Sequence, residues 1–315
     1  MPLSRIAGPM VLAAIALPAY GETLPGPTYF ATLYAGTELS ASDTRRFEAG
    51  LALRPANWTA SVALSRTMFE LPDEDTGSTV GNLKVIYRIG DFGVGAGVRR
   101  GEVDDLSLTR GWLVSGLYES GQWSLGGEIE RRGTSLAASE FTDEQIPTLG
   151  RVSGVARCDV DSTAYGAQAY FSLSRWSGFA RFRMFDYEEF QCAISITGSV
   201  PRPQPARGRA LGARLAATTL RSVTGFNPRL LSSESSLLES ALALGAGYSL
   251  DDRWIVGGEF YRDVNGFGRE DDSLTALVFA NRRLSESLSL EAWAGYGSAA
   301  IEAAAFTGVR LTADL

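Results

Sequence analysis

The stretch Phe306–Leu315 reads FTGVRLTADL. From Val309 onward every second residue is apolar, and the residues between them include Arg310 and Asp314. Successive side chains point to opposite faces of a β-strand, so this strand would have one apolar and one polar face. The same alternation recurs back to about residue 28. The chain from there to its end is therefore predicted to be all-β.

Composition excludes several function classes. Of the 315 residues, 45% are hydrophobic and 21% charged, with 35 glycines and 12 prolines, as expected for a folded protein rich in strands and turns. A formal net charge of -7 argues against a nucleic-acid partner, because phosphate binding needs a basic surface. The sequence has no histidine, so it lacks the commonest general base and the usual imidazole metal ligand. No enzymatic activity, cofactor or metal site is expected.

Residues 1–21 have the pattern of a secretory signal peptide. Arg5 precedes an apolar run, which is followed by the small-x-small cleavage site Ala19-Tyr20-Gly21. The run is shorter than the roughly 18 to 20 residues of a spanning helix. We expect cleavage before Glu22 and a single domain over residues 22–315, in which no apolar run is long enough for a spanning helix. If this domain lies in a membrane, it must do so as a β-barrel.

The mature chain is predicted to form successive β-hairpins. Residues 47–53 and 58–64 both alternate, and turn residues 54–57 join them. One face of this hairpin is uniformly apolar, and the other mixes small residues with charge. The pattern returns five times, over residues 83–98, 112–129, 165–184, 242–260 and 274–296. With an opening strand near residues 29–36 and the closing strand, this gives about fourteen strands.

Strand order and tryptophan positions favour a membrane barrel over a soluble β-sandwich. Short turns alternate with longer polar connections, as in outer-membrane barrels, and an even number of strands returns both ends to the periplasm. A sandwich also alternates, but its outward face is polar on every strand. Trp58, Trp123 and Trp254 directly follow short turns and Trp176 lies within one, a placement typical of a periplasmic aromatic girdle. The predicted fold is an antiparallel up-and-down transmembrane β-barrel.

By its leader, hairpins, tryptophan positions and terminal strand, the chain resembles bacterial outer-membrane β-barrel proteins, and in size the monomeric fourteen-stranded porins. The resemblance is architectural, with no specific motif. It implies export to the bacterial outer membrane, contact with outer-membrane lipid and lipopolysaccharide, and a monomer or small homo-oligomer.

The inward face of such a barrel would carry many charges among glycines and small residues. Burying so many charges without water would be costly, so a hydrated interior is favoured, and about fourteen strands imply a modest pore. The alternative is an interior closed by pairs of arginine and carboxylate. The predicted pore-lining residues are Lys84, Arg88, Arg99, Glu128, Glu130, Arg132, Arg181, Arg183, Glu259, Arg283, Glu291 and Arg310.

Residues 191–236 form the longest irregular stretch and are expected to be an outer loop. A loop of this length is usually functional or disordered. We hypothesise that it folds over or into the mouth as an arginine-lined constriction, with a solvated loop as the alternative. The constriction residues would be Arg207, Arg209, Arg214 and Arg221.

The two cysteines, Cys158 and Cys192, flank the hairpin turn at Trp176 at similar distances. They are therefore expected to lie nearly opposite one another. In an exported protein this predicts a disulfide that ties the base of the long loop to the neighbouring strand.

Together these features favour a channel for passive diffusion of small polar or charged solutes. The alternative is a closed barrel with a structural or surface-interaction role through three acidic loop clusters, at residues 73–75, 102–105 and 270–272.

Overall fold

A computed structural model describes residues 30–41, 44–70, 75–104, 107–146, 150–188, 191–197, 238–265, 273–298 and 303–315. The signal-peptide prediction lies outside these residues. None of the described segments is a helix with the length and hydropathy of a membrane span. The strands are β1 (Ala31–Ser40), β2 (Thr44–Leu53), β3 (Trp58–Glu70), β4 (Asp75–Ile89), β5 (Phe92–Val103), β6 (Ser107–Ser120), β7 (Trp123–Ile146), β8 (Gly150–Leu173), β9 (Trp176–Tyr187), β10 (Gln191–Thr197), β11 (Leu238–Ser249), β12 (Trp254–Asn265), β13 (Ser273–Arg283), β14 (Leu288–Ser298) and β15 (Ala303–Asp314).

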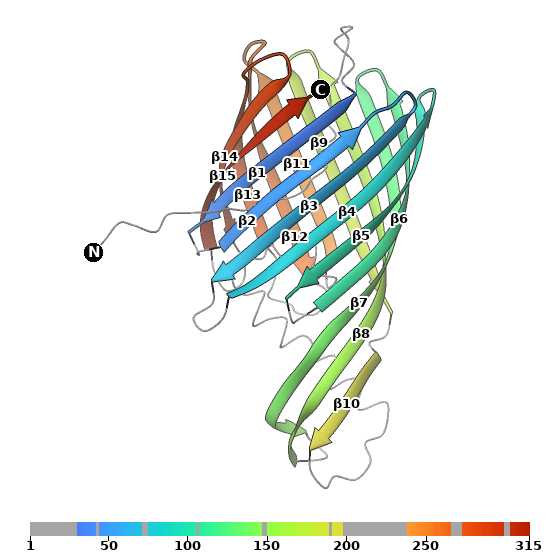
Figure 1. Ribbon diagram of the computed structural model, residues 1–315, viewed down its shortest axis with the longest axis vertical. Coiled ribbons are helices and arrows are strands. Elements are labelled where there is room, and N and C mark those ends of the chain that lie inside the picture. The colour runs from blue at the N-terminus through green and yellow to red at the C-terminus, as the bar shows by residue number, and fades with distance from the viewer. Residues whose placement is uncertain are drawn as a thin grey trace, which may run out of the picture.

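Fourteen of these strands close into an antiparallel barrel (Figure 1). Each of them pairs with its neighbours in the chain, except that β9 pairs with β11, and β1 pairs with β15 to complete the ring. The seam runs from Thr32 opposite Asp314 to Ser40 opposite Phe306. Beside it, the Leu315 amide donates to the Ala31 carbonyl at 2.8 Å. The predicted fold class, the strand number of the barrel and the pairing of the terminal strand with the first are confirmed.

Six short turns lie at the same end of the barrel as Leu315, which we call the turn end. Gly90 and Gly121 have φ of 58° and 54°, in the left-handed region that two-residue hairpin turns require and that glycine adopts without strain. In another turn, the Asp251 carboxylate accepts hydrogen bonds from the backbone amides of Arg253 and Trp254, at 2.7 and 2.8 Å. Local turn chemistry thus fixes the hairpins that the sequence predicts.

The apolar face of the strands points outward. On β2 and β3, Phe47 is 51% exposed and Leu64 57%, whereas the intervening Glu48 is 5% and Ala63 3% exposed. On β15, Val309 and Leu311 are exposed and Arg310 faces the interior, as predicted. A surface of this kind is stable in hydrocarbon and unfavourable in water.

Aromatic side chains, which we call the aromatic girdle, lie on the outer surface near the turn end on β3 to β11. Its members are cross-strand partners in four pairs, with ring centroids 4.6 to 5.7 Å apart. Aromatic pairs of this geometry stabilise neighbouring strands by about 0.2 to 1 kcal/mol each. The four tryptophans predicted at the short turns, Trp58, Trp123, Trp176 and Trp254, are all exposed on the outer surface. More rings than the tryptophans belong to the pairs: Trp58 with Tyr87, Phe92 with Tyr118, Trp123 with Phe171, and Trp176 with Tyr248.

Strands β7 and β8 are 24 residues long and extend far beyond the others at the end opposite the turn end (Figure 1). Strand β10 pairs with this extension, so that residues 191–197 form a strand. The expectation of one irregular loop over residues 191–236 was therefore wrong for its first seven residues. The stretch reads QCAISIT, which has high β-propensity and completes the edge that β8 would otherwise leave unpaired.

Candidate functional site

The predicted pore-lining residues all occupy inward-facing positions of their strands. The twelve residues do not form one group within the barrel. Arg88 pairs with Glu119 at 3.2 Å near the turn end, where both side chains are about two-fifths exposed. Arg283 ends β13 beside a short turn and is exposed there. Most of the others belong to two clusters within the barrel.

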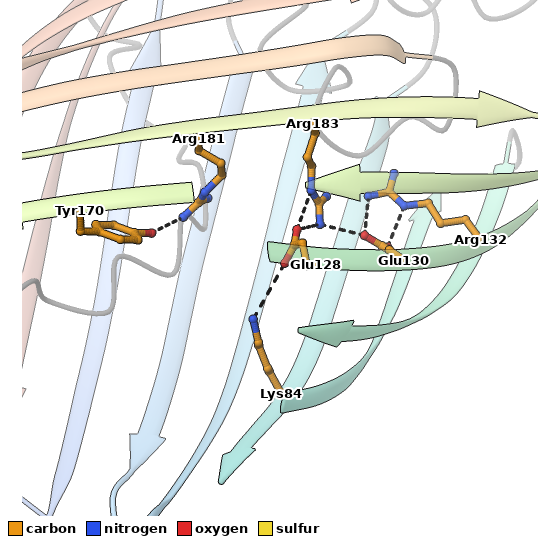
Figure 2. Close-up of polar contacts among 7 residues, drawn as sticks. All are labelled: Lys84, Glu128, Glu130, Arg132, Tyr170, Arg181 and Arg183. Carbon is orange, nitrogen blue, oxygen red and sulfur yellow. Dashed lines mark hydrogen bonds and ion pairs between the residues drawn. The ribbon is translucent and has the colours of Figure 1, made fainter. Parts of the chain in front are cut away.

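The Glu128 cluster lies on the wall that runs from β4 to β9. Its side chains point toward one another across the inner surface (Figure 2). Three strands contribute cations, and β7 contributes both acids. The cluster consists of Lys84, Glu128, Glu130, Arg132, Arg181 and Arg183.

Glu130 and Arg132 form the buried core of this cluster. Arg132 donates through Nε and Nη2 to the two oxygens of Glu130, at 2.7 and 3.0 Å. Arg183 Nη2 donates to the same carboxylate at 2.9 Å. The Arg132 and Glu130 side chains are 0% and 1% exposed. Charges buried this completely are tolerated only when paired and hydrogen-bonded, which explains the two-pronged contact.

Glu128 extends the cluster toward the centre of the barrel. Its carboxylate accepts from Arg183 Nε at 2.8 Å, and Lys84 Nζ lies 3.9 Å from its other oxygen. Arg181 lies nearby and donates to the hydroxyl of Tyr170 at 2.8 Å. The Lys84, Glu128 and Arg183 side chains retain 18, 17 and 14% exposure. This edge of the cluster thus borders space that a water molecule can reach.

The Arg310 cluster lies on the wall formed by β14, β15, β1 and β2. Arg310 Nε donates to Glu48 at 2.9 Å, and Arg310 Nη1 lies 3.9 Å from Glu291. The same guanidinium stands 5.6 Å from the centre of the Trp293 ring. The indole nitrogen of Trp293 in turn donates to Glu38. Arg46, also buried on this wall, is the register partner of Glu38. Among these residues the carboxylates of Glu38, Glu48 and Glu291 thus outnumber the two guanidinium groups, the reverse of the Glu128 cluster.

Three of these interior contacts pass over a glycine on the strand between the partners. Gly166 is the register partner of both Glu128 and Arg183, and a Cβ there would lie 2.7 Å from Glu128 Cγ. Gly36 stands in the same relation to Glu48 and Arg310, with a Cβ 2.8 Å from the Glu48 carboxylate. The absence of a side chain on the middle strand is what lets the outer two meet.

The third contact of this kind joins Trp293 to Glu38. Gly308 is the register partner of both residues, and a Cβ there would collide with the indole. Glycine on the inner face is thus a sequence signal for side-chain contact between strands that are not neighbours.

An apolar patch lines the interior beside the Arg310 cluster. Phe279 packs against it, and so does Val103 from the end of β5, five strands away around the ring, so this contact crosses the lumen. Sequence reasoning described the inward face as small and charged, and so missed the patch. The available signal was the inward parity of these aromatic residues beside Glu259 and Glu291. The buried members of the patch are Tyr261, Leu277, Trp293 and Phe306.

Both cysteines lie on the extension formed by β8 and β10, opposite the turn end. Cys158 of β8 and Cys192 of β10 are direct register partners, so the predicted opposition of the two residues is confirmed. The four arginines of the proposed constriction, Arg207, Arg209, Arg214 and Arg221, lie outside the described residues.

Comparison with known proteins identifies the fold alone. No protein-family model and no curated protein matches the sequence. Among solved structures, the chain is similar to the CymD monoaromatic hydrocarbon channel, with a TM-score of 0.54, 9% identity, and coverage of 91% of this chain and 89% of that one. It is similar to a Pseudomonas aeruginosa FadL homologue, with a TM-score of 0.54, 11% identity and 90% coverage of both chains. In fold, the chain resembles the bacterial outer-membrane β-barrels.

Proposed function

We propose that the protein is an outer-membrane channel for the passive diffusion of small polar or charged solutes, exported by residues 1–21. The observation that carries this proposal is the pair of charged clusters on opposite walls of the barrel. Strand β14 of the Arg310 cluster lies nearly half the ring away from β7 of the Glu128 cluster. A solute between them would meet excess cations on one wall and excess carboxylates on the other, which is how charged rings set selectivity in channels.

A second candidate solute class is small aromatic compounds. The apolar patch offers ring-sized apolar surface directly beside the Arg310 cluster. CymD, which has a similar fold, is described as a monoaromatic hydrocarbon channel. In vesicles, uptake of a benzoate-type aromatic anion faster than an aliphatic anion of equal size would support this class, and equal rates would contradict it.

Planar-bilayer recording of the refolded protein tests the channel directly. We expect discrete conductance steps from the wild type. The variant Lys84→Gln/Arg181→Gln should shift ion selectivity toward cations, because it removes two interior cations while the contacts of Glu130 with Arg132 and Arg183 remain. The matched control, Arg175→Gln/Arg253→Gln, removes two exposed cations from the short turns. Recorded in 1 M salt, where charges are screened beyond about 3 Å, this control should leave ion selectivity unchanged.

A folded, heat-modifiable protein that gives no steps would contradict the channel. That result would instead support a closed barrel with a structural or surface role. Steps with unchanged selectivity in both variants would keep the channel but remove the Glu128 cluster as its selective element.

We also propose that Cys158 and Cys192 form a disulfide. Closing a loop of this length contributes about 4 kcal/mol in the chain-entropy model and would fix β10 against β8. We expect the wild type to migrate faster without reductant than with it, and the control Cys158→Ser to migrate alike in both conditions. Equal wild-type mobility, with both thiols open to alkylation, would refute the bond.

A further inference from the structure

Two strands with uncharged inner faces divide the barrel wall into halves. Strands β3 and β11 are seven strands apart in either direction around the ring, so they lie on opposite sides of the lumen. Their inward positions carry small uncharged residues, among them Ser61 and Ala63 on β3 and Ala243 and Gly245 on β11. The charged side chains of the interior therefore lie on one half, from β4 to β9, or on the other, from β12 through β15 to β2.

The two halves carry equal and opposite charge at the inward positions of the barrel that the structure describes. The half from β4 to β9 has six cations and three carboxylates: Lys84, Arg88, Arg99, Arg132, Arg181 and Arg183 against Glu119, Glu128 and Glu130. The half from β12 to β2 has the reverse, six carboxylates and three cations: Glu38, Glu48, Glu259, Asp263, Glu291 and Asp314 against Arg46, Arg283 and Arg310. These charges cancel in sum but are separated across the lumen.

Charges from both halves lie at a similar height in the barrel. Lys84, Arg181 and Glu259 are each five residues from the turn end of their strands, and Glu291 is three residues from it. Five residues at about 3.3 Å each, tilted by about 40°, rise roughly 13 Å along the barrel axis. This height is about the middle of the roughly 25 Å band that faces lipid in outer-membrane barrels. A solute would therefore meet both halves at the same point of its path.

One charge in each half is held only loosely by its partner. Lys84 Nζ lies 3.9 Å from Glu128, and the Glu291 carboxylate lies 3.9 Å from Arg310 Nη1. A hydrogen bond between charged groups is about 2.7 to 2.9 Å long, so neither contact is one. Among the residues that the structure describes, Lys84 Nζ and the Glu291 carboxylate have no closer partner. Their side chains are 18 and 25% exposed, so both can contact a solute in the lumen.

We infer that the barrel prefers small zwitterionic solutes, which carry an ammonium and a carboxylate group and no net charge. Lys84 contacts the carboxylate of the solute, and Glu291 contacts its ammonium. An ion of one sign is attracted by one half of the wall and repelled by the other, whereas a zwitterion can orient its two charges to suit both halves. The inference names the solute class of the proposed channel and rests on that proposed function.

Osmotic swelling of vesicles that contain the refolded full-length protein tests this preference. The solutes are γ-aminobutyrate, a zwitterion, and erythritol, an uncharged polyol of similar size, compared at low ionic strength so that the interior charges are not screened. Wild-type protein should admit γ-aminobutyrate about fivefold faster than erythritol, since one exposed ion pair contributes up to about that factor. Lys84→Gln and Glu291→Gln should each reduce this ratio to about twofold or less, because each removes one of the two contacts. The erythritol rate should stay unchanged in both variants.

The matched control is Arg175→Gln/Asp252→Asn, which removes one cation and one carboxylate from exposed turns and should keep the wild-type ratio. Heat-modifiable gel mobility, measured first on each protein, reports barrel folding separately. Equal entry of the two solutes through the wild type would overturn the zwitterion preference and leave the channel standing. A ratio that is unchanged in both single variants would overturn the roles of Lys84 and Glu291. A folded wild type that admits neither solute would contradict the channel itself, and the preference with it.

Discussion

Deleting Phe306–Leu315 should abolish assembly of the barrel. The deletion removes nearly all of the pairing of β15 with both β1 and β14, so two strand edges lose their partners. Each backbone group left without a hydrogen bond in hydrocarbon costs several kcal/mol, and the seam involves many of them. It also removes Phe306 from the apolar patch and Arg310 from its cluster.

Heat-modifiable mobility and protease resistance in lipid vesicles measure this effect. The truncated chain should show neither, whereas Leu315→Ala, which keeps the whole of β15, should show both. A truncated protein that inserts and resists protease would disprove the closure between β1 and β15.

Glu130→Ala should destabilise the folded barrel by roughly 3 to 5 kcal/mol, the cost of leaving a buried charge without its partner. Arg132 is fully buried, and its Nη1 already has no hydrogen-bond partner in the described structure. Loss of the carboxylate would leave the buried guanidinium without its bidentate partner, 5.0 Å from the centre of the Phe185 ring. Urea unfolding in vesicles, followed by tryptophan fluorescence, measures the change.

Two further variants make this result specific. Glu119→Ala removes the partner of Arg88 where both side chains are 37 to 41% exposed, and it should cost about 1 kcal/mol or less. Glu130→Leu/Arg132→Met replaces both charges by apolar groups and should recover much of the lost stability. Equal effects of Glu130→Ala and Glu119→Ala would show that burial of the Glu130 pair does not matter for folding.

The barrel could be predicted from the sequence because the lipid-facing requirement is local and repetitive. Every membrane-spanning residue of one parity must tolerate hydrocarbon. The outward orientation of Phe47 and Leu64 can therefore be predicted from the alternation in their own strands, without knowledge of the strands beside them. This constraint ends where the strands leave the membrane. Beyond Arg131 the outward face of β7 is no longer apolar, because Gly133 and Ser135 lie there, and the extension of β7 and β8 with β10 was not predicted.

The interior could be predicted only in part, for a related physical reason. Parity alone places Glu128 and Arg183 inward. Their contact, however, depends on the register of three consecutive strands, which alternation does not specify beyond a multiple of two residues. The apolar patch depends in addition on the cross-section of the barrel, because Val103 reaches it from a distant strand.

The contacts over Gly166, Gly36 and Gly308 resolve this ambiguity in the folded protein. A strand displaced by two residues keeps its apolar side in lipid and regains its backbone ladder, so neither force distinguishes the displaced arrangement from the native one. Displacing β8 by two positions would place Ala164 or Gln168 where Gly166 now separates Glu128 from Arg183. A side chain would then obstruct the ion pair. The glycines therefore specify strand register. Each of the three contacts can form in only one register of its middle strand, so polar contacts inside the barrel distinguish registers that are equivalent on the lipid-facing surface.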